Sequence, residues 1–181
     1  MSARAGLAVA VALQTLALFA IVGMKQWTLN TGTPVLLETR PVDPRSLFRG
    51  DYVVLRYAIS MPDAGLPGMP LEVRKGDAVF VTLRQDGEFW KAVSVHAERP
   101  DAAPGAVVIK GDARHAAGRG APLDLQYGIE EYFVPEGEGR AIEQPRQEGN
   151  VSILVAVDRF GKAGIKAVLI DGAVRYEEKL F

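Results

Sequence analysis

Cysteine is absent from this chain of 181 residues, and histidine occurs only twice, at His96 and His115. Without cysteine the chain has no disulfide, no cysteine nucleophile and no cysteine-based metal site. Two histidines so far apart do not make a histidine-rich metal site, and we expect neither a bound metal nor a cofactor. A strong excess of charge is also missing, since the formal net charge is −1. Nucleic-acid binders normally carry a basic excess or stripe, so the composition argues against a nucleic-acid partner.

Charged residues are missing from residues 5–24, an apolar run of 20 residues near the N-terminus. At about 1.5 Å per residue, a helix of this length spans roughly 30 Å, the thickness of a membrane's hydrocarbon core. Arg4 and Lys25 flank the run, and Trp27 stands where an interfacial aromatic residue is expected. A cleaved signal peptide is the alternative, but its apolar region is typically about 7–15 residues long and ends in a small-x-small site. We therefore predict an uncleaved, single-pass membrane anchor.

The anchor divides the chain into three predicted parts: the membrane helix at 5–24, a polar linker at 25–33 and a domain at 34–181. The flanking basic residues nearly balance, so the positive-inside rule barely decides the orientation. The short N-terminal tail and the large polar domain favour an inner (plasma) membrane protein whose domain lies outside the cytoplasm. Gln14, near the middle of the run, points to a partner helix because an amide in lipid seeks a hydrogen bond.

Beyond the linker, short runs of alternating or β-branched residues recur between glycines, aspartates and prolines, a pattern typical of strands. Gly-Asp pairs at 50, 76 and 111 and an Asp-Gly pair at 86 predict turns, the last of them a hairpin. The pattern predicts a mainly β domain, barrel- or sandwich-like, with a β-rich α+β arrangement as the alternative. The predicted strands cover residues 34–39, 52–59, 78–83, 89–95, 106–110, 123–127, 132–134, 151–158, 165–170 and 173–176, and a short helix is expected over 140–148.

The best-marked strand follows the turn signal Gly50-Asp51. Residues 53, 55 and 57 should point to one face of this strand, and residues 52, 54 and 56 to the other. We expect Leu55 and Tyr57 to share a buried face, and Gly50 to adopt a backbone conformation disfavoured for other residues. A buried tyrosine needs a hydrogen-bond partner for its hydroxyl, and the nearby arginines and aspartates are candidates.

The run Gly50-Asp51-Tyr52-Val53-Val54-Leu55-Arg56-Tyr57 resembles the signature of the GDYXXLXY family, and residues 42–49 resemble the segment that precedes it. Residues 127–139 resemble the family's second block, and residues 155–158 with 169–172 resemble its end. The resemblance implies a membrane-anchored bacterial protein with no established activity. Since such proteins tend to be encoded beside multi-spanning membrane proteins, it also implies a membrane-protein partner.

A second resemblance, to type I signal peptidases, tests for catalysis. Residues 75–80 and 89–93 look superficially like the Gly-Asp box and the lysine-bearing strand of those enzymes. Their chemistry needs a serine eight residues before the first Gly-Asp pair, where this chain has Val42, and Ser46 stands in the wrong place. We therefore assign no catalytic residue and interpret Lys91 as a surface lysine of a hairpin.

Five glutamates between residues 130 and 143 form the densest acidic segment. Paired carboxylates can perform acid–base hydrolysis or bind a divalent cation, so an exported hydrolase stays open as an alternative function. The spacing matches no calcium loop, and Gly137 and Gly139 argue against a rigid site, which favours a solvated loop. The charged cluster Asp43, Arg45, Arg49 and Asp51 is likewise interpreted as a capping network before the strand, with an anion or peptide site as the alternative.

The aromatic and turn-forming residues of the two blocks suit a surface that is presented to a partner. We predict that the blocks lie close together, with the Tyr132/Phe133 strand near the Gly50-Asp51 turn. The predicted function is a membrane-anchored, extracytoplasmic accessory or interaction module, with a hydrolase or a binder of a cell-envelope ligand as alternatives. The candidate surface consists of Arg45, Arg49, Gly50, Asp51, Tyr52, Leu55, Tyr57, Tyr132, Phe133, Pro135, Glu136 and Gly137.

Overall fold

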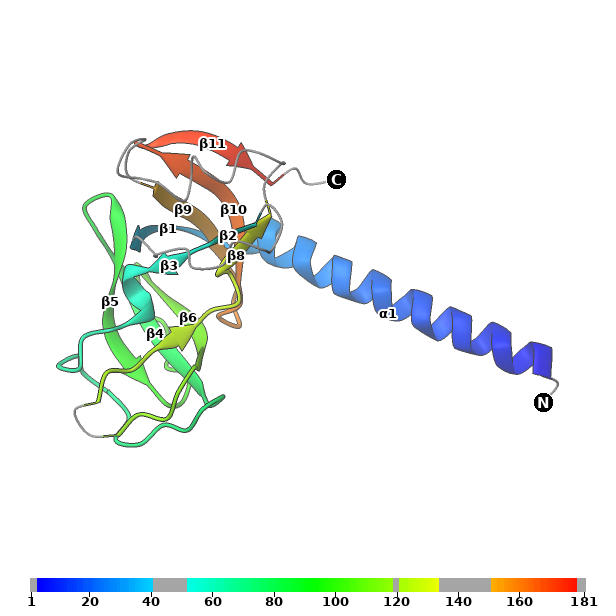
Figure 1. The fold of residues 1–181 in the computed structure, drawn as a ribbon, viewed down its shortest axis with the longest axis horizontal. Coiled ribbons are helices and arrows are strands. Elements are labelled where there is room, and N and C mark those ends of the chain that lie inside the picture. The colour runs from blue at the N-terminus through cyan, green and yellow to red at the C-terminus, as the bar shows by residue number, and fades with distance from the viewer. Residues whose placement is uncertain (1–2, 41–51, 119–120, 134–150, 179–181) are drawn as a thin grey trace.

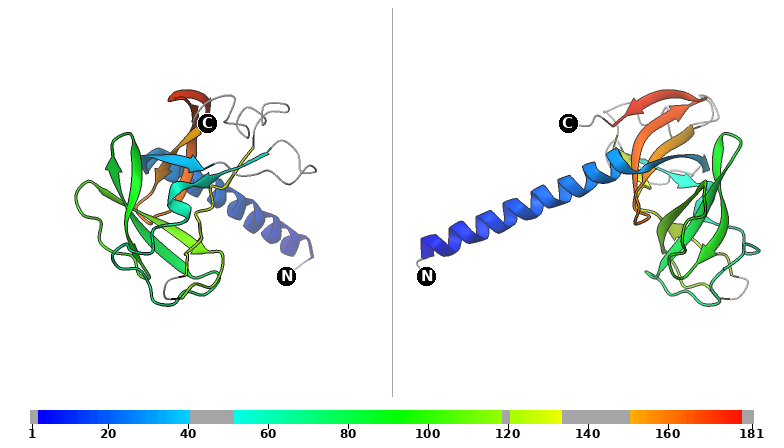
Figure 2. Two further views of the ribbon diagram at one scale, coloured as in Figure 1. Left: turned by 60° about the vertical axis from the view of Figure 1, so that its left-hand side comes forward. Right: turned by 180° about the vertical axis from the view of Figure 1, so that it is seen from behind.

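A long helix, α1 (Ala3–Thr31), projects from a domain made of strands in the computed structural model (Figures 1 and 2). The structure describes residues 3–40, 52–118, 121–133 and 151–178. The 29 residues of α1 span about 44 Å, more than the roughly 30 Å of a hydrocarbon core. Among the described residues, α1 is the one helix long and apolar enough to cross a membrane, which agrees with the predicted anchor.

The helix does not end where the linker was predicted to begin. It continues to Thr31, so the prediction of a linker over residues 25–33 is wrong for residues 25–31. Thr28 and Leu29 are buried against the domain. Contacts with residues distant in the sequence therefore extend the helix. The residues after Met24 are polar, and their local pattern does not reveal these contacts.

Two antiparallel sheets form the domain, which confirms the mainly β prediction. The first sheet has the order β11-β10-β9-β1-β3, the second has the order β5-β4-β6-β7, and β2 and β8 form a separate pair (Figure 1). The strands are β1 (Thr33–Arg40), β2 (Tyr52–Val54), β3 (Arg56–Tyr57), β4 (Ala78–Asp86), β5 (Phe89–His96), β6 (Ala106–Ala113), β7 (Leu125–Gln126), β8 (Glu131–Phe133), β9 (Val151–Val157), β10 (Ala163–Ile170) and β11 (Ala173–Glu177).

The two sheets share one hydrophobic core. Val35 and Leu37 of β1 and Val155 of β9 belong to the same buried cluster as Val81 and Leu83 of β4. All five side chains are inaccessible to solvent. Residues two apart on a strand point to the same face, so the alternation visible in the sequence becomes the inner face of each sheet. Full burial of each such side chain contributes about 1.5–3 kcal/mol.

The predicted hairpin at Asp86 is confirmed. β4 and β5 pair up to Asp86 and Phe89, and a two-residue turn joins them. Lys91 lies on the surface, where its ammonium group bonds the carboxylate of Asp86 at 2.6 Å. It therefore has the structural position expected of a surface lysine.

The Gly-Asp pair at 111 does not form the predicted turn. Gly111 lies inside β6, which runs on to Ala113 and pairs with β4 and β7. A Cβ atom at this position would lie 3.0 Å from the ring of Tyr127. Gly111 thus serves the close approach of an aromatic ring, a role that turn statistics do not reveal. At Gly76-Asp77 the expected turn is present.

The signature run does not form a single strand over residues 52–59. β2 ends at Val54, β3 covers two residues, and a short 3₁₀ helix, η1 (Ala58–Ser60), follows. The chain changes partner at Leu55, since β2 pairs with β8 whereas β3 pairs with β1. The expected faces are confirmed, because Leu55 and Tyr57 are buried and Val54 is exposed. The predicted helix over 140–148 and the conformation of Gly50 lie outside the described residues.

Candidate functional site

The signature strand and the second block of the chain bind each other directly. β2 pairs with β8 in antiparallel register, with Tyr52 opposite Phe133 and Val53 opposite Tyr132. The backbone N–H of Leu55 then donates to the carbonyl of Glu130 at 2.7 Å. The predicted proximity of the two blocks is confirmed for these strands.

Two buried tyrosines fasten the blocks reciprocally. The hydroxyl of Tyr57 donates to the carbonyl of Ile129 at 2.5 Å, and the hydroxyl of Tyr127 donates to the carbonyl of Ile59 at 2.7 Å. Each ring reaches the backbone two residues beyond the other tyrosine. The partner of the Tyr57 hydroxyl is therefore a backbone carbonyl. The sequence had suggested an arginine or aspartate side chain instead.

The carboxylate of Glu130 closes the turn between these groups. It accepts hydrogen bonds from the backbone N–H of Tyr127 at 2.5 Å and of Gly128 at 2.9 Å. Burial raises the pKa of both tyrosines, Tyr57 and Tyr127, and the negative charge of Glu130 raises these pKa values further. Both hydroxyls are thus held protonated as donors, which is a structural role and not that of a general base.

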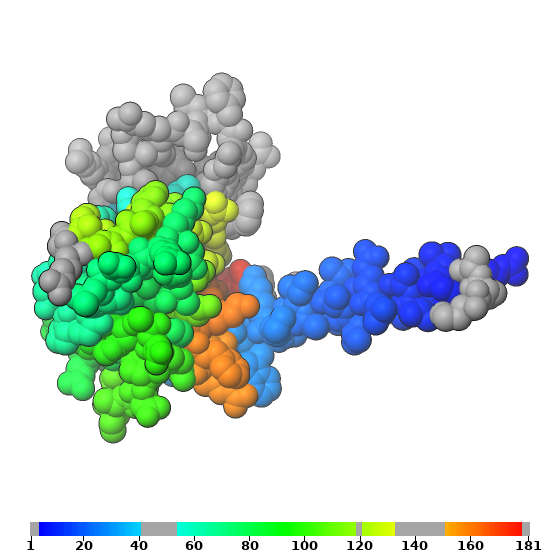
Figure 3. Space-filling view, turned by 90° about the horizontal axis from the view of Figure 1, so that it is seen from below, coloured from blue at the N-terminus to red at the C-terminus, as the bar shows by residue number. Residues whose placement is uncertain are grey.

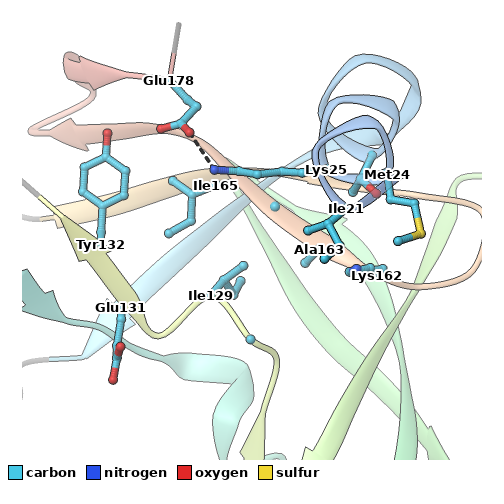
Figure 4. Close-up of a pocket in the computed structure, with 13 residues that line it drawn as sticks. Ile21, Met24, Lys25, Ile129, Glu131, Tyr132, Lys162, Ala163, Ile165 and Glu178 are labelled. Carbon is cyan, nitrogen blue, oxygen red and sulfur yellow. Dashed lines mark hydrogen bonds and ion pairs between the residues drawn. The ribbon is translucent and has the colours of Figure 1, made fainter. Parts of the chain in front are cut away.

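A groove of about 560 Å³ lies where α1 meets the domain (Figure 4). One wall is the last part of the helix, and the other is formed by β8 with the turn before it and by the start of β10. The site thus joins α1 to the second block of the chain. The lining residues are Ile21, Met24, Lys25, Thr28, Gly128, Ile129, Glu131, Tyr132, Lys162, Ala163, Gly164, Ile165 and Glu178.

The groove has an apolar floor and a charged rim. Ile21, Met24 and Ile165 present aliphatic side chains to it (Figure 4). At its edge the Lys25 ammonium group pairs with the Glu178 carboxylate at 2.8 Å. Partial burial raises the pKa of the nearby Tyr132 hydroxyl, and the charge of Glu178 adds to this shift. Such a site suits an apolar occupant with polar groups at one end.

The helix is fixed to the domain beside the groove. The Thr28 hydroxyl donates to the buried carboxylate of Asp158 at 2.8 Å. Leu29 packs so close to β10 that a Cβ atom at Gly164 would lie 2.9 Å from its Cδ2 atom. Because Thr28 and Leu29 are buried against the domain, the position of the helix wall of the groove relative to the other wall is fixed.

The predicted surface residues divide into four groups. Tyr132 lines the groove, whereas Leu55 and Tyr57 are core residues that hold the blocks together, so their assignment to an interaction surface is wrong. Of Tyr52 and Phe133 the structure describes the backbone pairing only. The remaining predicted residues lie outside the described part of the chain: Arg45, Arg49, Gly50, Asp51, Pro135, Glu136 and Gly137.

Sequence reasoning missed the helix side of the groove and its β10 side. Ile21 and Met24 look like any other apolar residue of a membrane span, and Ile165 looks like any strand residue. Only the packing of α1 against the domain makes them neighbours. Within the described residues, no cluster of three or more His, Asp or Glu side chains could hold a metal ion.

The fold and the groove define a mainly β domain carried on one apolar helix that is built into it. The chain belongs to the GDYXXLXY protein family, whose model matches residues 14–168. The match begins inside α1 and ends inside β10, so it includes both walls of the groove. No curated protein and no solved structure was found to match the chain.

Proposed function

We propose that this protein is a membrane-anchored, non-catalytic interaction module whose domain lies outside the cytoplasm of a bacterial cell, at the inner membrane. Its groove receives a membrane-spanning segment of a multi-spanning partner protein. The observation that carries the proposal is the position of the groove, with one wall made by the anchor helix itself.

The level of the groove supports a membrane-embedded occupant. Ile21 and Met24 belong to the uncharged run at 5–24, so this wall lies at the edge of the hydrocarbon layer when the helix spans it. Above them, Lys25, Lys162 and Glu178 supply charges at the level of the headgroups. A transmembrane helix has a matching pattern, since its apolar body ends in polar and aromatic interfacial residues.

The anchor has its own surface for the same partner. Residues 4–25 of α1 are exposed in the described structure. Gln14 lies in this stretch, and a polar amide in lipid is stabilised by a hydrogen bond from a neighbouring helix. A partner helix that follows α1 upward would enter the groove.

The burial of Tyr57 supports a role in binding over a role in hydrolysis. A catalytic pocket of this chain is expected to bring Asp51, Tyr57 and Glu136 together, and of these three residues the structure describes Tyr57. Its hydroxyl is buried and bonded to a backbone carbonyl, so it is withheld from any substrate.

Photocrosslinking in intact cells tests the proposal. A photoreactive amino acid replaces Met24 or Ile165 in the groove, and Val93 on the far side of the domain serves as the control, since it is exposed on β5. We expect adducts from the two groove positions that map to an apolar membrane-spanning segment of one multi-spanning protein, and none from Val93. Adducts to phospholipid alone, to soluble proteins or equally from all three positions would contradict the proposal.

A further inference from the structure

The turn between β9 and β10 carries an exposed aromatic side chain. Phe160 is 59% exposed, and the guanidinium carbon of Arg159 lies 4.7 Å from the centre of its ring. Lys162 follows on the same turn. Arg159, Phe160 and Lys162 are all exposed, so a large apolar group and two cations point away from the core.

The turn is held in one conformation. One carboxylate oxygen of Asp158 accepts hydrogen bonds from the backbone N–H of Phe160 at 2.9 Å and of Lys162 at 3.0 Å. The carbonyl of Gly161 accepts from the N–H of Lys110 at 2.8 Å, which ties the turn to β6. The exposure of Phe160 is therefore built into a rigid turn and does not come from a loose loop.

The same aspartate fixes the turn to the membrane helix. The second carboxylate oxygen of Asp158 accepts from the Thr28 hydroxyl at 2.8 Å, in a buried contact. Figure 3 shows the start of β10 and the turn before it, in orange, side by side with the end of α1 in blue. The turn thus has a defined height along the helix.

That height is the headgroup layer. Thr28 comes four residues after Met24, the last residue of the apolar run, which places it about 6 Å farther along the helix axis. The headgroup region on each side of a bilayer is about 5–8 Å thick. Trp27, at the same level, is 57% exposed, as expected for an interfacial aromatic residue.

We propose that the β9–β10 turn enters the headgroup layer of the membrane that α1 spans. The Phe160 ring lies at the boundary between the headgroups and the lipid chains, and Arg159 and Lys162 bind lipid phosphates. Aromatic rings favour this layer, and basic side chains are attracted to an anionic lipid surface. The turn gives the domain a second attachment to the membrane, which fixes its rotation about α1.

Lipid quenching of a single tryptophan tests this inference. Trp27→Phe and Trp90→Phe remove both native indoles of the full chain. Phe160→Trp then places one indole on the turn, and Val93→Trp places it on β5 as the control. Each variant is reconstituted into protein-free vesicles of phosphatidylglycerol and phosphatidylcholine, with or without bromine on the acyl chains.

We expect bromine to remove most of the emission of the Phe160→Trp variant and to leave that of the Val93→Trp variant unchanged. Adding Arg159→Ala and Lys162→Ala should weaken the quenching most in vesicles that contain phosphatidylglycerol. Equal quenching at the two positions would overturn the inference. The vesicles hold no other protein and the turn meets headgroups in either orientation, so the outcome is independent of the proposed partner and topology.

Discussion

At the scale of single residues, the signature run binds the second block through several side-chain and backbone contacts. Leu55 contributes an apolar side chain to the core and a backbone N–H to Glu130. Tyr57 exchanges hydroxyl-to-carbonyl bonds with the segment that carries Tyr127. The signature run therefore has a structural role. The residue next to it that lines the groove is Tyr132.

Leu55→Ala should destabilise the full chain in detergent by about 2–5 kcal/mol, because it leaves a cavity at a residue that is 5% exposed. Val54→Ala, one residue earlier on the exposed face, should change the free energy of unfolding by less than about 0.5 kcal/mol. Chemical denaturation followed by circular dichroism measures both values. Equal midpoints for Leu55→Ala and wild type would refute the assignment of the faces.

Arg56 is more than a solvent-facing strand residue, because its guanidinium group pairs with Asp124 at 2.7 Å. The Asp124 side chain is largely buried, and its other carboxylate oxygen has no partner among the described atoms. Arg56→Ala should therefore lower the free energy of unfolding by about 1 kcal/mol. Arg56→Lys, which keeps the charge, should recover part of the loss in the same denaturation experiment.

The buried tyrosines predict a loss of stability in alkali. The pKa of Tyr57 and Tyr127 is raised in the folded state by burial, whereas an unfolded tyrosine titrates near 10. The tyrosines' contribution is complete below about pH 10 and declines above it, by up to about 1.4 kcal/mol per pH unit for each residue. Tyr57→Phe with Tyr127→Phe should lower stability at pH 8 and flatten this decline. The free energy of unfolding is measured between pH 8 and 11 for wild type and for the double variant, and lysine titration affects both proteins alike. The same slope in the two proteins would contradict the assignment.

At the scale of elements, the junction of α1 with the first sheet decides the shape of the molecule. Thr28 and Leu29 belong to the helix, and both side chains are buried. Gly32 follows the last turn and lies against β9. The helix and the domain are therefore one structural unit at their meeting point, although the sequence looks like an anchor followed by a linker.

Gly32→Ala should disturb this junction. The added Cβ atom would lie 2.6 Å from the carbonyl oxygen of Thr28 and 2.9 Å from the backbone nitrogen of Val157, and neither backbone atom can move aside freely. We expect a loss of about 1–3 kcal/mol in the unfolding experiment. Gly23→Ala is the matched control, since a Cβ atom there has nothing within 4 Å. A Gly32→Ala variant as stable as the Gly23→Ala variant would contradict the close packing.

At the scale of the whole molecule, the direction in which α1 leaves the domain decides which surfaces of the domain lie near the helix. The groove and the β9–β10 turn both lie at the end of α1, and β5 lies on the side of the domain away from it (Figures 1 and 2). The contact of α1 with the domain therefore places the groove and the exposed β9–β10 turn near the same end of the helix.

The topology itself is testable with fusions after Phe181. The short basic N-terminus and the uninterrupted apolar run predict a domain outside the cytoplasm. A reporter enzyme that is active only outside the cytoplasm should work at this junction, and a reporter that is active only in the cytoplasm should fail. The opposite pattern would reverse the orientation and would move the proposed partner surface to the cytoplasmic side.

Features that depend on neighbours in the sequence could be predicted without the fold. The apolar run predicts the long helix α1, the alternation predicts the strands, and the Asp86-Gly87 pair predicts the hairpin. Alternation also places Leu55 and Tyr57 on one buried face. Local periodicity is enough for these because a helix or strand repeats its geometry every few residues.

Only the tertiary structure decides the features that join distant segments. The end of α1 depends on the contact of Thr28 with Asp158, and the division of the signature strand depends on a change of pairing partner at Leu55. Gly111 lies in a strand because β6 pairs with β4 at this position, and the Tyr127 ring leaves no room there for a side chain. The groove combines side chains from residues 21 to 178, and no local pattern encodes which of these meet. Burial and pairing between such segments are settled by packing of the whole chain, so the site could be derived only once the fold was known.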